Sequence, residues 1–318
     1  MLIAALGCGF LLDLLLGDPK WLPHPVVFLG KLIGYLERQV RHFAGDDSSN
    51  LLFGGFFLVI VVCFLSYGIP YVILTLAGHY SYYWVFAFTV LLSFQILATR
   101  SLAKAAQEVK KALEQTEDLT LARTKLSYIV GRDTQELTRE EIIKATIETV
   151  AENTSDGVIA PLFYLFLGGI PLGLLYKAIN TMDSMLGYRT EKFLYLGRAA
   201  AKLDDAANFI PSRFTALLLL VAATLLHLDA ANGWRIFRRD RFKHLSPNSA
   251  QTEAVVAGIL HVQLGGGHYY FGEFVAKATI GNKDREPVVA DITTTNRLLY
   301  ATAWLGFLLC GCIRYLAF

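Results

Sequence analysis

Charged side chains are scarce in this chain of 318 residues. Asp, Glu, Lys and Arg make up 18% of the sequence, whereas soluble globular domains average about 25%. Hydrophobic residues make up 54%, and the mean hydropathy is +0.44. The formal net charge is only +2, and no basic patch alternates with aromatic residues as a nucleic-acid surface requires. These shortages argue against a soluble domain or a nucleic-acid binder and favour a polytopic membrane protein.

Cysteine is also rare, and a phosphate-binding loop is missing. The four cysteines lack the spacing of zinc ligands and lie in apolar runs, so we interpret them as small buried hydrophobic residues. No GxxxxGK[ST] motif occurs, so any nucleotide site is not a P-loop. The N-terminal MLIAALGCGF lacks the basic region of a cleaved signal, which favours a membrane segment.

Long apolar runs predict an all-α fold, because helices satisfy their own backbone hydrogen bonds in lipid. Gly168-Gly169-Ile170-Pro171 interrupts one run, so we expect a re-entrant or short membrane helix there. The candidate spans are residues 51–77, 84–99 and 298–316, with shorter apolar runs at 2–17, 158–176 and 214–228.

The charged loops give the expected orientation. We interpret residues 1–318 as one membrane-embedded domain, with amphipathic helical loops at 100–157 and 229–297. Each of these loops carries nine Lys and Arg, so the positive-inside rule places both in the cytoplasm. We therefore expect a multi-pass protein of the cytoplasmic (inner) membrane whose active site faces the cytoplasm.

Polar residues are concentrated between residues 138 and 213. Thr138-x-x-Glu141 predicts a capping box that begins a helix running to about Asn153. Glu148 and Glu152 are four residues apart, so both carboxylates lie on one face of that helix. They can flank a cation, although a solvated helix face explains the pair equally well. Thr154-Ser155-Asp156-Gly157 predicts a helix end, and Pro161 suits the first turn of the next helix.

A second acidic cluster follows at Asp204-Asp205-x-x-Asn208. Oxygen ligands at this spacing can hold a hard cation such as Mg²⁺, although an exposed helix start or a salt-bridge site also explains them. Nearby cations suit phosphate oxygens, and acids for a metal beside bases for phosphate are typical of phosphoryl chemistry. The candidate phosphate ligands are Lys177, Arg189, Arg198, Lys202, Arg213 and, in two earlier loops, His24 and Arg132. His24 is alternatively a structural loop residue, and the Gly265-Gly266-Gly267 triplet is either an anion-binding turn or a flexible one.

Five blocks of sequence, in order from residue 11 to about 266, resemble the CobD/CbiB family of cobalamin-biosynthesis proteins, the adenosylcobinamide-phosphate synthases. One departure is Thr252, where many members of the family are expected to carry proline. The blocks are DLLLGDPKWLPHPVVFLGKLIGYLE, LSYIVGRDTQELTREEIIKATIETVAENTSDGVIAPLFY, YKAINTMDSMLGY, LDDAANFIPSRFTA and PNSAQTEAVVAGILHVQLGG.

The resemblance implies an integral membrane ligase. It would join adenosylcobyric acid, a corrinoid, to (R)-1-amino-2-propanol phosphate or a related amino-alcohol phosphate through an amide, using ATP and Mg²⁺. The expected catalytic residues are Glu148, Glu152, Asn153, Asp183 and Asp205. The expected metal ligands are Glu148, Glu152, Asp156, Asp204, Asp205 and Asn208. The expected ATP- and phosphate-binding residues are Lys177, Asn180, Arg189, Arg198, Arg213, His24 and Arg132.

Two other classes remain open from the residues alone. A membrane prenyltransferase-like enzyme would use the same acids to hold a Mg²⁺-diphosphate but would not consume ATP. A transporter or a scaffold for corrinoid enzymes would need acids along a path through lipid, whereas most acids here lie in amphipathic loops. Besides the lipid bilayer, the expected partners are a second copy of the chain or other membrane enzymes of the cobalamin pathway.

Overall fold

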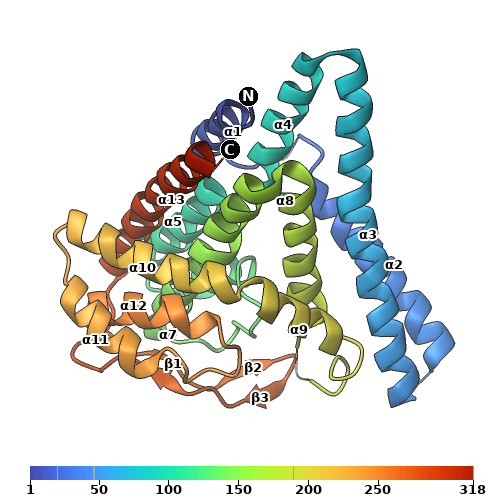
Figure 1. The fold of residues 1–318 in the computed structure, drawn as a ribbon. Helices are drawn as coiled ribbons and strands as arrows, with labels where there is room; N and C mark the ends of the chain where they lie inside the picture. The colour runs from blue at the N-terminus through green and yellow to red at the C-terminus, as the bar shows by residue number, and fades with distance from the viewer. Residues whose placement is uncertain (20, 46, 189, 318) are drawn as a thin grey trace. The chain divides into compact units, whose positions relative to one another are not determined.

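The computed structural model describes residues 1–19, 21–45, 47–188 and 190–317, and the fold is almost entirely helical (Figure 1). The chain forms two compact units, and each is assembled from separate stretches of sequence. The first comprises Met1–Ala98, Ala160–Ala207 and Leu309–Phe318, and the second comprises Thr99–Ile159 and Asn208–Leu308. The expectation of an all-α polytopic protein is confirmed, because four helices are long and apolar enough to cross a membrane, or up to five if a bent pair counts as one.

The first unit is built on a long helical hairpin. Its helices are α1 (Leu2–Leu16), α2 (Pro25–Ala44), α3 (Ser48–Tyr80), α4 (Tyr82–Ile96), α8 (Ala160–Leu186) and α9 (Arg198–Ala207). Only Ser81 separates α3 from α4, and the two lie side by side, while α2 packs along the other half of α3 (Figure 1). Asp47 caps α3, because its carboxylate accepts the Asn50 N–H at 2.7 Å. The core between α2, α3 and α8 contains Ile33, Leu58 and Met182.

The predicted break in α8 is confirmed. Gly168 and Gly169 leave helical geometry, and Gly169 has φ +67°, which glycine adopts without steric cost. The predicted helix end at Thr154–Gly157 is wrong. A π-helical turn at Ser155–Ile159 carries α7 directly into α8, because Val158 and Ile159 are fully buried there and the turn keeps them in the core.

The second unit surrounds one buried helix. Its helices are α5 (Thr99–Gln115), α6 (Thr120–Ser127), α7 (Arg139–Thr154), α10 (Phe209–Leu225), α11 (Ala230–Asp240), α12 (Ser249–Leu260) and most of α13 (Val289–Ala317). Every residue of α12 from Ala250 to Leu260 is buried. Gly258 makes this possible, because a Cβ there would lie 2.8 Å from the Gly233 Cα on α11.

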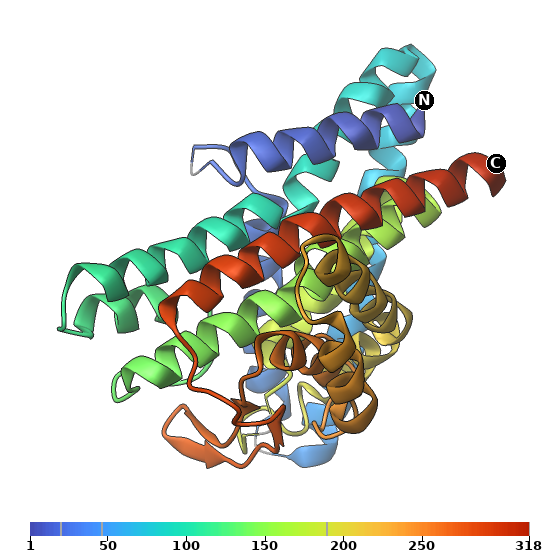
Figure 2. The same cartoon turned by 90° about the vertical axis from the view of Figure 1, so that its left-hand side faces the viewer.

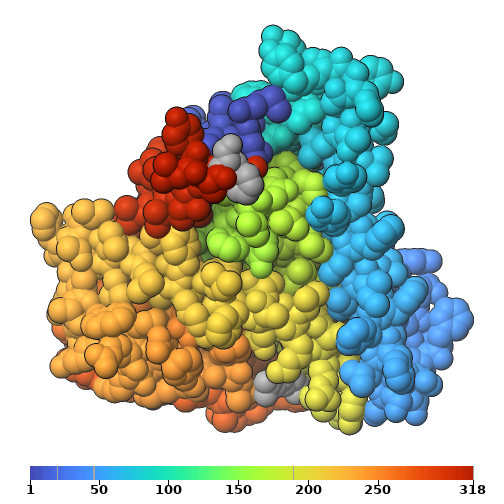
Figure 3. Space-filling model, in the orientation of Figure 1, coloured from blue at the N-terminus to red at the C-terminus, as the bar shows by residue number. Residues whose placement is uncertain are grey.

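Neighbouring elements enclose α12. The segments of α10 and α11 appear as a continuous yellow-to-orange surface (Figure 3), whereas α12 is buried. The helix α5 runs beside the start of α13, where the Asn296 Nδ2 donates to the Ala103 carbonyl at 3.0 Å (Figure 2).

Two short antiparallel strand pairs lie in the segment that was expected to be a helical loop. β1 (Leu264–Gly265) pairs with β4 (Thr279–Ile280), and β2 (His268–Tyr270) pairs with β3 (Glu273–Val275). They join α12 to α13 and carry several of the charged residues described next.

Candidate functional site

Glu148 is buried on α7 with both carboxylate oxygens bound. The capping box predicted for this helix is confirmed, with Thr138 and Glu141 bonding to each other's backbone N–H. Further along the helix, Glu148 Oε2 lies 2.5 Å from Arg132 Nη2, and Glu148 Oε1 accepts the Gly265 N–H at 2.6 Å. This carboxylate therefore links α7 to the loop before it and to strand β1.

Gly265 is required at the contact with Glu148. Its φ is +76°, and a Cβ there would lie 2.5 Å from the Ala278 carbonyl oxygen on the neighbouring strand. The glycine triplet therefore binds an anion, as one of the two interpretations held, but that anion is the side chain of Glu148.

Arg132 also contacts a histidine. Its Nη1 lies 2.7 Å from His268 Nε2, and because a guanidinium only donates, that ring nitrogen is the acceptor. Burial, followed by the charge of Arg132, lowers the pKa of His268 to about 4, so the ring is neutral at pH 7. For Arg132 itself, burial lowers the pKa, but Glu148 and Tyr270 outweigh it and hold the pKa above its usual value.

Glu253 is a second buried acid, on α12. Its side chain is 1% exposed, and the nearest cationic or ionisable groups are Lys277 Nζ at 3.5 Å and His244 Nδ1 at 3.7 Å. Within the described residues neither carboxylate oxygen has a hydrogen-bond partner. Burial raises the pKa of Glu253 to about 8, with Lys277 opposing the rise and Glu152 and Glu148 adding to it.

We call Arg132, Glu148, Glu253, His268 and Lys277 the buried charge cluster. Burial lowers the pKa of Lys277, but the neighbouring acids, among them Glu152 and Glu148, outweigh it, so the ammonium remains charged. With Glu253 protonated, the charges of Arg132 and Lys277 are matched, within the described part of the cluster, by the carboxylates of Glu148 and Glu152. The half-buried Glu152 therefore belongs to the same electrostatic environment as its predicted partner Glu148.

The first unit contains Asp204 and Asp205 of the second acidic cluster, whereas Asn208 belongs to the second unit. Asp205, Arg198 and Lys202 line one cavity of about 380 Å³ between α9 and the loop before it, which we call the α9 cavity. Asp204, next in sequence, is buried instead. Tyr164 ties the end of α9 to α8, because its hydroxyl donates to the Ala207 carbonyl at 2.9 Å.

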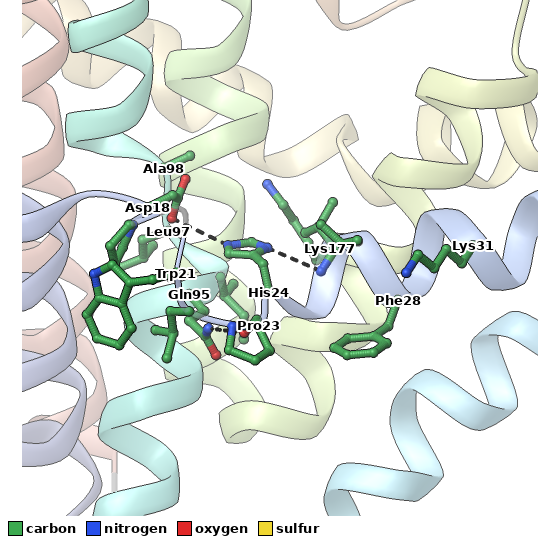
Figure 4. A pocket seen from close by; sticks show the side chains of 15 residues that line it. Asp18, Trp21, Pro23, His24, Phe28, Lys31, Gln95, Leu97, Ala98 and Lys177 are labelled. Atoms are coloured by element: carbon green, nitrogen blue, oxygen red, sulfur yellow. Dashed lines mark hydrogen bonds and ion pairs between the residues drawn. The ribbon is translucent and has the colours of Figure 1, made fainter.

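A larger pocket, of about 720 Å³, opens beside the link between α1 and α2 (Figure 4). Its lining includes Asp18, His24, Lys31 and Lys177, so two of the predicted phosphate ligands, His24 and Lys177, come together here. His24 also caps α2, because its Nδ1 accepts the Val26 N–H at 3.3 Å. His24 therefore has a structural role at the start of α2, and its role in phosphate binding stays a prediction.

The structure places the other predicted site residues that it describes on or beside the helices α7, α8 and α10. Asn153 donates to the Thr149 carbonyl at 3.0 Å on its own helix, and Asp156 is half-buried in the π-helical turn. Asp183 and Asn180 are half-buried on the second half of α8. Asn208, which is buried, precedes α10, and Arg189 lies outside the described residues.

Arg213 makes structural contacts. Its guanidinium lies 3.6 Å from the centre of the Phe209 ring and donates to Asn248 Oδ1 at 3.1 Å. These contacts tie α10 to the loop before α12. Across the described residues, no group of three or more His, Cys, Asp and Glu side chains is arranged to hold a metal ion.

The sequence interpretation missed Glu253, Lys277, His244 and His268. One signal was present for Glu253, which is followed by the seven apolar residues AVVAGIL. A lone acid beside such a run is costly to bury without a partner. The other three residues lie in loops and short strands whose spacing carries no periodic signal.

Taken together, these features define a helical multi-pass membrane protein that contains buried acid–base clusters. The chain belongs to the CobD/CbiB family, because the family model described as "CobD/Cbib protein" matches residues 6–299. The resemblance seen in the five sequence blocks is thereby confirmed.

Relatives match along almost the whole chain. "Cobalamin biosynthesis protein CbiB" of Salmonella choleraesuis is 46% identical over 312 residues, which cover 97% of this chain and 96% of that protein. "Cobalamin biosynthesis protein CobD" of Clostridium tetani is 45% identical over 294 residues, 92% of this chain and 91% of that protein. The CobD protein of Listeria monocytogenes is 44% identical over 318 residues, the full length of both. No solved structure matches.

Proposed function

We propose that this protein acts in cobalamin biosynthesis as an adenosylcobinamide-phosphate synthase. In that reaction a carboxyl group of adenosylcobyric acid forms an amide with (R)-1-amino-2-propanol phosphate or a related amino-alcohol phosphate. The observation that carries the proposal is the near full-length identity to relatives named as cobalamin biosynthesis proteins. We place the enzyme in the cytoplasmic membrane with its active site facing the cytoplasm, where ATP is available.

Amide formation from a carboxylate requires activation, because hydroxide is a poor leaving group. We propose ATP as the activating substrate, so that the corrinoid carboxylate becomes an acyl phosphate and ADP leaves. The amine then attacks the acyl carbon, phosphate leaves, and the amine gives up a proton. These steps place several anionic groups in one site, so the protein must supply cations and oxygen ligands around them.

The α9 cavity has a suitable donor set. Asp205 supplies the hard oxygen ligand that Mg²⁺ prefers, and Arg198 and Lys202 in the same wall supply charge for phosphate oxygens. One or two carboxylates are usually enough for Mg²⁺ in a nucleotide site, because phosphate oxygens and water complete its shell. Bound there, Mg²⁺ would neutralise charge on the phosphates. We propose that Asp205 holds the metal and that Arg198 and Lys202 orient the phosphate group.

The buried charge cluster has a different role in this proposal. Both oxygens of Glu148 are bound by groups of the protein, so Glu148 fixes Arg132 and Gly265 in place. We therefore propose Glu148 as a positioning residue that holds the strand-bearing segment against α7. Glu152, which shares its electrostatic environment and is half-buried, remains a candidate for contact with substrate.

The test is a reconstituted reaction. Detergent-purified protein is incubated with adenosylcobyric acid, the amino-alcohol phosphate, ATP and Mg²⁺, and the corrinoid products are separated and weighed by mass spectrometry. We expect the amide product together with an equal amount of ADP, and neither when any one component is left out. ATP hydrolysis that is indifferent to the corrinoid, or product formed without ATP, contradicts the ligase proposal.

A further inference from the structure

The pocket beside the α1–α2 link continues into an apolar groove. We propose that pocket and groove together bind one anionic phospholipid, with its phosphate in the pocket and an acyl chain in the groove. This inference concerns a separate binding site and does not depend on the proposed reaction. We call the two parts the headgroup pocket and the acyl groove.

The headgroup pocket is positively charged and large. It measures about 720 Å³ and is lined by Lys31 from α2 and Lys177 from α8, with Asp18 and His24 on the link (Figure 4). The exposed side chain of Trp21 forms another part of its wall. Two ammonium groups against one carboxylate favour an anion, and a phosphate oxygen is a strong acceptor for lysine.

The beginning of α2 adds to this preference through its dipole. The helix has 20 residues, and its N-terminus carries partial positive charge. Its first amides are already used, since Pro25 has none, Val26 donates to His24 Nδ1, and Val27 donates to the His24 carbonyl. A phosphate here is therefore held by side chains, with the helix contributing only its field.

His24 is held in place in the wall of the same pocket. Because Nδ1 accepts the Val26 N–H, the neutral ring carries its proton on Nε2. Nε2 lies 3.4 Å from Asp18 Oδ1, so the proton is directed toward the side of the ring where Asp18 lies (Figure 4). The Nε2 atom is buried and, within the described residues, makes no hydrogen bond, so the ring shapes the wall of the pocket without offering an exposed donor.

The acyl groove adjoins this pocket. It measures about 380 Å³ and shares Pro23, Phe28 and Gln95 with the headgroup pocket. Among the described residues, none of those that line it is charged. Its remaining lining comes from α2, α3, α4 and α8, namely Pro25, Leu29, Leu32, Leu65, Ser66, Ile69, Pro70, Leu92 and Leu174.

The two cavities lie beside the point at which the chain changes from apolar to charged sequence. The helix α4 contains no charged residue, whereas α5, which begins three residues after α4 ends, contains six. Gln95 to Ala98 line the headgroup pocket at this transition, and Trp21, 80% exposed, is the residue type that favours the membrane interface. We take this change as the membrane interface, the level at which lipid phosphates sit with their chains directed toward the apolar side.

The shape of the headgroup pocket and the acyl groove distinguishes a phospholipid from a soluble phosphate compound. A free phosphate compound would fill the headgroup pocket and leave the adjoining apolar groove without a ligand. A phospholipid matches both parts, because its charge complements Lys31 and Lys177 and its chain covers the apolar lining. The continuous pair of cavities therefore favours the lipid over a soluble anion.

The experiment measures lipid binding by native mass spectrometry. Delipidated full-length protein is titrated with phosphatidylglycerol or with phosphatidylcholine of the same chains, and the bound fraction is recorded. Lys31→Gln removes one pocket charge, and Arg38→Gln, on the exposed side of the same helix and outside both cavities, is the matched control. We expect Lys31→Gln to weaken phosphatidylglycerol binding about tenfold, the value of one charge-assisted hydrogen bond, and Arg38→Gln to change it little.

A competition experiment on the wild-type protein uses no variant. Inorganic phosphate and glycerol phosphate are added in excess to the complex with phosphatidylglycerol, and we expect the lipid to stay bound. Equal binding of both lipids, equal effects of the two variants, or displacement of the lipid by excess inorganic phosphate or glycerol phosphate would each overturn the proposal. The last result would assign the pocket to a soluble phosphate compound.

Discussion

Replacing Glu253 with glutamine gives a direct test of the protonated acid in α12. Glu253→Gln keeps the shape of the side chain and removes its proton equilibrium. The pKa of Glu253 is raised from an ordinary value of 4.5 to about 8 in the folded protein, with burial as the main cause. Between those two pH values the folded state holds a proton that the unfolded state has released. The contribution of this group to stability is therefore complete below the unfolded pKa and is lost as pH rises through the folded pKa.

The expected loss of stability follows from the distance between the unfolded and folded pKa values of Glu253. Each pH unit within it is worth about 1.4 kcal/mol, so between pH 5.5 and 7.5 the wild-type protein loses on the order of 2 to 3 kcal/mol that the glutamine variant keeps. The free energy of unfolding of each protein is measured in detergent across this range. Subtracting the free energy of unfolding of the variant from that of the wild type removes the contribution of the other titrating groups, because both proteins share them.

The control is Glu191→Gln, which changes an exposed acid in the loop before α9. Its difference curve is expected to be flat over the same range. A flat or rising curve for Glu253→Gln would refute the reasoning, because it would mean that Glu253 is ionised in the folded protein, with Lys277 as its counter-charge.

Three further substitutions test other parts of the structure. Arg132→Met leaves a buried carboxylate without its cation and is expected to cost about 3 to 5 kcal/mol in thermal unfolding experiments; a loss below about 1 kcal/mol would mean that the pair is not buried in solution. Asp205→Asn is expected to lower the rate of corrinoid amide formation about 100-fold or more with normal membrane insertion, whereas Glu191→Gln leaves it unchanged; near-normal turnover would remove the α9 cavity from the chemistry. Gly55→Ala places a methyl group against a backbone carbonyl of the loop before α9 and is expected to lower the stability by about 1 to 3 kcal/mol. Its control is Gly68→Ala on the same helix, where the new methyl group meets no atom within 4 Å; equal melting temperatures of the two variants would show that the loop shifts freely.

Local signals in the sequence predicted local structure well. Thr138 and Glu141 form the capping box because their bonds span only three residues, and the break at Gly168 follows from the backbone preferences of glycine. The spans were predictable because hydropathy is a property of one segment. The helix end expected at Gly157 is wrong for the opposite reason, since burial of neighbouring apolar residues outweighed a weak turn signal.

The buried charge cluster could not be predicted from spacing. Glu148 meets Arg132 across 16 residues and Gly265 across 117, and neither separation leaves a periodic trace. Strands of two or three residues are likewise too short to show alternation. The sequence therefore identified Glu148 as important while its pairing, which turns it from a metal candidate into a positioning residue in our proposal, depended on tertiary structure.

The hydrogen bond between Glu148 and Gly265 can form only late in the synthesis of the chain. The 117 residues between its two ends include all of α8 and α9, which belong to the other unit. At roughly 5 to 20 residues per second, a ribosome needs about 6 to 23 seconds to deliver the glycine after the glutamate. During this interval α7 waits with its acid exposed or held by Arg132 alone. A chain that stops before residue 265 never completes that contact, so fragments from premature termination are expected to be degraded rather than to accumulate.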